Sequence, residues 1–141
     1  MPPALCLSLI HICVIATAKH FVANNEEYGR LEVSSDMDQR TLREIYLPAF
    51  EASVKEGKVG AVMDAYNPVN GVFMTQNGYL NNEILKQEWG FDGILMSDWG
   101  ATHDGVAAAN GGLDLEMPSA AYMYKDTLLA AIKEDVYKRQ G

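Results

Sequence analysis

The chain has 141 residues, 48% of them hydrophobic, with 11 Lys and Arg against 19 Asp and Glu and a net charge of −8. This length suffices for one globular domain but not for a closed eight-unit barrel, which needs roughly 250 residues. The acidic balance, with no basic run, argues against nucleic acid or an anionic membrane as a partner. Cys6 and Cys13 lie near the N-terminus without a CxxC motif or a His cluster, so we predict neither a metal site nor a disulfide framework.

The first apolar stretch is too short to span a membrane. Leu5 to Val14 is apolar, but a transmembrane helix needs about 20 such residues. Met1 to Ala4 carry no Lys or Arg, whereas a secretory leader begins with a basic region. We therefore expect no secretory leader here.

From Val14 onward, strand-like and helical patterns alternate. A short β-rich run, Val14–Ala18, ends at Lys19 and His20. After a polar loop, Thr41 and Glu44 have the spacing of a capping box, which predicts a helix start with Thr41 as the cap.

Pro48 lies inside this helical pattern, so we expect the helix to kink or split there. A second strand-like run, Val59–Tyr66, leads into the turn-rich segment Asn67–Gly71. Asn81–Trp89 then has the apolar spacing of a helix, with Ile84 and Leu85 facing inward.

The second half of the chain continues the alternation. A strand at Ile94–Met96 is followed by a short helix at His103–Asn110, a brief strand at Leu113–Leu115 and an amphipathic helix at Asp126–Glu134. Four strand–helix units in succession predict an α/β fold whose parallel strands are joined by right-handed crossovers.

Polar or ionisable side chains stand where each of the four strands ends. They are Lys19 and His20, Tyr66 and Asn67, Asp98 and Trp99, and Glu116. In a parallel sheet these four ends lie at one edge, which is where α/β enzymes place their sites. The presence of polar side chains at all four strand ends therefore predicts a functional site at this edge.

Asp98 is the leading candidate within it. The apolar run before it stops abruptly at this carboxylate, and Trp99 follows. One interpretation is a helix N-cap with Trp99 as packing, because Asp is a favoured cap. The other is a catalytic carboxylate beside an apolar ring that can face a sugar. The polar groups at neighbouring strand ends favour the second.

A carboxylate nucleophile suits glycosyl transfer, in which an anion stabilises and traps an oxocarbenium-like centre. Lys19 and His20 offer adjacent groups that can hydrogen-bond sugar hydroxyls, although each could instead be an ordinary surface or structural residue. Met63 and Tyr66 could supply an apolar wall and a phenol, with Met63 in the core as the alternative.

Other chemistries lack their motifs. Gly111-Gly112 matches no nucleotide-binding fingerprint, and there is no HExxH motif. Asp114 and Glu116 could be further acids, but carboxylates after a short strand are commonly caps or ion-pair partners, so neither is assigned to catalysis. We predict no cofactor and no metal.

Several segments together resemble the N-terminal barrel domain of glycoside hydrolase family 3. In chain order they are Lys19–Glu27 with Arg30, Arg40–Glu51, Val62–Gly71, Trp89–Gly93, Ser97–Ala101 and Gly112–Pro118. The resemblance implies that residues 14–134 form about four consecutive units of a (β/α)8 barrel. Residues 1–13 and 135–141 match nothing in the family, and we expect them to be non-native ends.

The resemblance also implies roles for individual residues. Asp98 matches the nucleophile of a retaining mechanism. Five positions match residues of the −1 sugar subsite: Lys19 and His20, which would hydrogen-bond sugar hydroxyls, and Met63, Tyr66 and Trp99, which would line it. Asp64 stands where a small hydroxyl residue is more usual.

The form of the Lys19–Asn25 segment is similar to that of the β-glucosidase branch. The resemblance therefore implies exo-acting hydrolysis of β-linked glucosides or oligosaccharides. It places the acid/base Glu on a second domain, so the chain by itself is expected to be inactive. Two alternatives remain: a β-xylosidase-type relative, and a non-catalytic carbohydrate-binding half-barrel.

Overall fold

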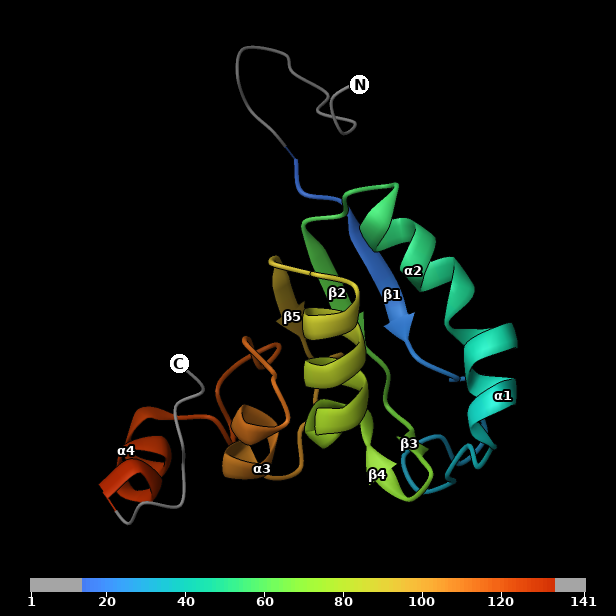
Figure 1. Ribbon diagram of the computed structural model, residues 1–141. Helices are drawn as coiled ribbons and strands as arrows, with labels where there is room; N and C mark the ends of the chain where they lie inside the picture. The colour runs from blue at the N-terminus through green and yellow to red at the C-terminus, as the bar shows by residue number, and fades with distance from the viewer. Residues whose placement is uncertain (1–13, 134–141) are drawn as a thin grey trace.

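A three-stranded parallel sheet organises the protein. The computed structural model describes residues 14–133, and the ends predicted to be non-native lie outside them. Strand β2 (Ala61–Asp64) lies between β1 (Thr17–Phe21) and β5 (Ile94–Met96), parallel to both (Figure 1). A parallel bridge from Met96 to Leu115 marks a fourth position beside β5. The predicted α/β class with consecutive parallel strands is confirmed.

Within residues 14–133, seven helical segments connect or follow the strands. They are α1 (Gln39–Thr41), η1 (Leu42–Tyr46), α2 (Pro48–Lys55), η2 (Met74–Gln76), η3 (Tyr79–Glu88), α3 (Gly105–Asn110) and α4 (Lys125–Lys133). Helix η3 ends with a hydrogen bond from Trp89 N to Ile84 O at 3.0 Å, the wide winding of a π-type helix. Within residues 14–133, no helix combines the length and apolar character needed to cross a membrane.

Several element boundaries differ from the sequence-based predictions by one to three residues, and two of these differences have a clear local cause. Strand β1 begins at Thr17 and continues through Lys19 and His20 rather than ending before them. The helical segment begins earlier than predicted, because Asp38 is its N-cap and accepts a 2.7 Å hydrogen bond from Thr41 N. Acidic and hydroxyl caps compete closely for this role, and here the earlier acidic residue is the one used.

Pro48 divides the helix as predicted. Helix η1 ends at Tyr46, and Pro48 is the first residue of α2. Proline fits a first helical turn because it has no N–H group to leave unpaired there.

The segment predicted as a turn is a short hairpin. Strands β3 (Pro68–Val69) and β4 (Val72–Phe73) pair antiparallel. Asn70 and Gly71 between them have φ angles of 50° and 80°, as a two-residue hairpin turn requires. The hairpin lies beyond the arrowhead end of β1, at the carboxyl edge of the sheet (Figure 1).

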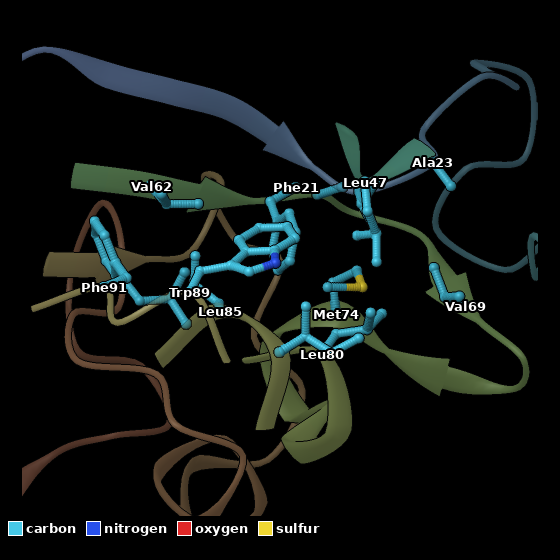
Figure 2. Close-up of a cluster of buried hydrophobic side chains, with 14 of the residues drawn as sticks. Phe21, Ala23, Leu47, Val62, Val69, Met74, Leu80, Leu85, Trp89 and Phe91 are labelled. Carbon is cyan, nitrogen blue, oxygen red and sulfur yellow. The ribbon is translucent and has the colours of Figure 1, made fainter. Parts of the chain in front are cut away.

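The core lies between one face of the sheet and the helices. Val62 of β2 and Leu95 of β5 are fully buried there with Leu85 of η3. Phe21 contacts the Trp89 ring edge-on, with centroids 6.0 Å apart (Figure 2). Burying such apolar and aromatic surface stabilises the fold and fixes the sheet against η3.

Asp64, at the end of β2, is a fully buried carboxyl group in this core. Asn81 Nδ2 donates a hydrogen bond to its Oδ2 at 3.2 Å, and its Oδ1 has no protein partner. Burial raises the pKa of Asp64 well above its usual range, and the hydrogen bond from Asn81 offsets this only in part. Asp64 therefore keeps its proton to a higher pH than an ordinary aspartic acid does.

This protonation gives the first prediction. The unfolded carboxyl ionises near pH 4, whereas the raised pKa of the folded one delays its ionisation to higher pH, so its contribution to stability is complete below pH 4. That contribution declines as pH rises toward the folded pKa. Asp64→Asn, an uncharged near-isostere, should flatten this decline in the free energy of unfolding, measured by urea denaturation from pH 4 to pH 8. An unchanged pH dependence in the variant would show that Asp64 ionises equally in both states.

Candidate active site

One register row crosses the sheet on the face opposite the core. Lys19 pairs with Met63, Met63 with Met96, and Met96 bridges to Leu115. Side chains alternate between the two faces of a strand, and the buried Val62 lies on the helix-covered face. Lys19 is therefore exposed and Met63 half-buried on the other face, near the carboxyl ends of the strands.

An irregularity in β1 directs His20 toward the site. Lys19 pairs with Met63 and Phe21 pairs with Asp64, so His20 is an extra residue on the β1 side. Phe21 is fully buried in the core. Such bulges re-aim a side chain and occur often beside active sites. Regular alternation would have put Lys19 and His20 on opposite faces of the sheet.

His20 and Asp98 lie side by side, although β2 separates their strands. His20 Nε2 is 3.3 Å from Asp98 Oδ2, and the Asp98 side chain is only 13% exposed. Asp98 Oδ1 accepts a 2.7 Å hydrogen bond from Trp99 N. Each carboxylate oxygen thus faces a nitrogen, an arrangement that stabilises a negative charge in a partly buried setting.

The helix-cap interpretation of Asp98 is wrong. The next helix, α3, begins at Gly105 and is capped by Asp104, whose Oδ1 accepts a hydrogen bond from Ala107 N at 2.8 Å. Asp98 belongs to a loop between β5 and that cap, so its carboxylate is free of a helix terminus.

Tyr66 connects the end of β2 to the residue after Asp98. Its hydroxyl donates a 2.9 Å hydrogen bond to Trp99 O. Burial, and secondly the negative charge of Asp98, raise the pKa of Tyr66, so its hydroxyl keeps its proton. The Trp99 side chain is 63% exposed and leaves an indole face open to a ligand.

Arg30 lies beside Tyr66 at the candidate site; the family resemblance includes it but implies no role for it. Its guanidinium lies 4.2 Å from the centroid of the Tyr66 ring, a cation–π contact. It also pairs with Glu27 at 2.6 Å. Arg30 comes from the loop after β1, and no periodicity or spacing in that loop marks it.

The two remaining carboxylates at this edge have other contacts. Glu116 accepts hydrogen bonds from Tyr122 N and Met123 N. Asp114 pairs with Lys86 at 2.8 Å and accepts a 2.9 Å hydrogen bond from Leu95 N. In the part of the chain that the structure describes, no cluster of three or more His, Cys, Asp or Glu could hold a metal ion.

Comparison with known proteins gives a consistent result. Residues 8–139 match the model of the glycosyl hydrolase family 3 N-terminal domain, a span that extends beyond the resembling residues 14–134 at both ends. A β-glucosidase from Rhizobium radiobacter is 50% identical over 127 residues, which are 90% of this chain and 16% of that protein. An exo-α-(1→6)-L-arabinopyranosidase from Bifidobacterium longum is 48% identical over 123 residues, 83% of this chain and 16% of that protein.

Solved structures agree with the fold. A Bifidobacterium adolescentis β-glucosidase of the same family matches with a TM-score of 0.85 at 46% identity, covering 90% of this chain and 18% of that one. The Thermotoga neapolitana β-glucosidase 3B in complex with glucose matches with a TM-score of 0.82 at 42% identity, covering 89% of this chain and 18% of that one. The chain thus spans about a sixth of the length of these proteins.

Proposed function

The chain belongs to glycosyl hydrolase family 3, and on that premise we propose that it forms the nucleophile-bearing part of a retaining, exo-acting β-glucosidase site. The observation that carries the proposal is the geometry around Asp98. This carboxylate lies at the carboxyl edge of a parallel sheet, 3.3 Å from His20 Nε2 and next to an exposed indole. The β-glucosidase relatives support this choice of substrate class.

In this proposal Asp98 attacks the anomeric carbon. A bond forms between a carboxylate oxygen and C1 while the bond from C1 to the leaving oxygen breaks, and a second carboxylic acid protonates that oxygen. Water then attacks C1, gives a proton to the same second group and releases Asp98. The contacts with the Trp99 N–H and with His20 fix the direction in which the Asp98 carboxylate approaches C1.

The neighbouring side chains would hold the sugar. His20 and Lys19 supply polar groups to its hydroxyls, and the open face of Trp99 offers an apolar surface to the ring. Tyr66 supports the Trp99 carbonyl through its 2.9 Å hydrogen bond.

A second candidate function concerns the sugar. The Bifidobacterium longum arabinopyranosidase is nearly as similar to this chain as the Rhizobium radiobacter β-glucosidase is. Arabinopyranose and xylopyranose both lack the hydroxymethyl group of glucose, so a pentopyranosidase would need the same nucleophile but a narrower pocket. Comparing kcat/KM for aryl β-glucoside, β-xyloside and α-L-arabinopyranoside distinguishes these candidates, and we expect the glucoside to give the highest value.

The second prediction tests the nucleophile. It uses a hybrid protein, called the exchange enzyme below, in which residues 14–133 of this chain replace the matching part of the Rhizobium radiobacter β-glucosidase. Asp98→Asn in this enzyme should lower kcat by several orders of magnitude and leave sugar binding largely intact, because it removes a group needed only for bond formation. The measurement is aryl β-glucoside hydrolysis, with glucose inhibition reporting binding.

Asp104→Asn is the matched control for this variant. It makes the same change of a carboxylate to an amide at the cap of α3, where Asn caps a helix about as well as Asp, so it should leave both stability and kcat nearly unchanged. Full activity in Asp98→Asn would contradict the nucleophile assignment and would restore a purely carbohydrate-binding role for the chain.

The third prediction concerns Lys19 and His20. If they bind sugar hydroxyls more tightly in the transition state, Ala at either position lowers kcat/KM of the exchange enzyme at least tenfold, about 1.4 kcal/mol. The melting temperature should change little. Lys125→Ala and His103→Ala are matched controls for the same residue types. A variant that loses stability but keeps wild-type kinetics where folded would assign Lys19 and His20 to structure instead.

The fourth prediction is that the 141-residue chain by itself does not turn over aryl β-glucosides above background. Retaining hydrolysis needs two carboxyl groups about 5 Å apart, and Glu116 and Asp114 have other contacts. Strand β1 is also an unpaired edge among the described strands, which favours self-association. Multiple turnover by the purified monomer, abolished by Asp98→Asn, would contradict this and make Glu116 the first acid/base to test.

A further inference from the structure

We propose that Glu116 is a positioning residue for Asp98: its carboxylate orders the segment that holds the loop on both sides of the nucleophile. This inference rests on the proposed function, because it gives Glu116 a role in the reaction that Asp98 performs.

Glu116 is an anchor for backbone amides. It is 7% exposed, and its Oε1 and Oε2 accept hydrogen bonds from Tyr122 N at 3.1 and 3.0 Å. Oε2 also accepts one from Met123 N at 2.7 Å. Among residues 14–133 it has no ion-pair partner. A carboxylate buried this far is costly unless it is hydrogen-bonded, and here backbone N–H groups alone supply those bonds.

The residues on either side of Glu116 bind the residues on either side of Asp98. Ser97 N donates to Leu115 O at 2.9 Å, and Met117 N donates to Ser97 Oγ at 2.8 Å. Gly100 N donates to Met117 O at 2.9 Å. Ser97 is fully buried, so its hydroxyl acts inside the protein and not on a ligand.

The loop that Glu116 holds packs against the start of α3 at Tyr122. A Cβ on Gly105 would clash with Tyr122 O, which shows how closely the start of α3 packs against this backbone. The Glu116 carboxylate accepts hydrogen bonds from the N–H group of the same residue, Tyr122. The segment from Met117 to Tyr122 is therefore held at both of its ends. This also keeps in place the hydrogen bonds that Met117 makes to Ser97 and Gly100.

These contacts assign Glu116 to positioning and not to proton transfer. A general acid must offer a proton to the leaving group, whereas both Glu116 oxygens face N–H donors of Tyr122 and Met123. A displacement of about 1 Å in a catalytic group can lower the rate about a hundredfold. Loosening the 115–117 segment should therefore slow the reaction without weakening sugar binding.

The test uses Glu116→Gln in the exchange enzyme. The amide keeps the shape of the side chain but places an NH2 group where one oxygen accepted a hydrogen bond. We expect kcat to fall about tenfold to a hundredfold, with KM and the glucose inhibition constant within about twofold and both limbs of the pH profile in place. Hydrogen exchange at the Gly100 amide should become faster.

Ser97 supplies an independent pair of variants. Ser97→Ala removes the acceptor for Met117 N and should lower kcat similarly, whereas Ser97→Thr keeps a hydroxyl and should recover much of the loss. Asp114→Asn is the control: it alters a carboxylate two residues from Glu116 that contacts Lys86 and Leu95 N, and it should leave kcat unchanged.

Three results would overturn the inference. The first is wild-type kcat in Glu116→Gln or, should that variant not fold, in Ser97→Ala. The second is loss of one limb of the pH profile in Glu116→Gln, which would make Glu116 an acid/base. The third is an equal fall of kcat in Asp114→Asn. Asp98→Asn is assayed in parallel, and full activity there would refute the proposed function separately.

Discussion

The parallel pairing of β1, β2 and β5 is the constraint on which the site depends. It brings the carboxyl ends of all three strands to one edge, so residues far apart in the sequence meet there. The bulge at His20 adds the second requirement. By returning Phe21 to the core, it leaves His20 free to lie 3.3 Å from Asp98. The one-residue bulge in β1 therefore couples the packing of the core to the geometry of the site.

Four carboxyl groups near this sheet illustrate how environment decides what an acid does. Asp64 is enclosed by the core, and burial raises its pKa well above the usual range. Asp114 faces a lysine, and Glu116 binds backbone amides. Asp98 alone combines an imidazole neighbour, a backbone N–H and an adjacent exposed aromatic ring. That combination, more than its position in the sequence, distinguishes it as the nucleophile in our proposal.

Sequence patterns predicted the parallel α/β order, the helix division at Pro48 and the gathering of strand ends, because these follow from apolar periodicity and proline geometry. They did not predict the bulge at His20, since strict alternation is the default for a strand. The Asp38 cap was missed because Thr41 offered an equally good local signal.

Arg30 and Glu116 act through contacts with Tyr66, Tyr122 and Met123, and such contacts leave no local pattern.

The most direct test of the account is covalent capture of the nucleophile. A 2-deoxy-2-fluoro β-glucoside with a good leaving group slows release of the glycosyl-enzyme, so the intermediate accumulates. Incubated with the exchange enzyme and analysed by peptide mass spectrometry, it should label Asp98 with one sugar, and Asp98→Asn should remain unlabelled. A label on Glu116 or Asp114, or an enzyme that turns over substrate yet is never labelled, would contradict the account.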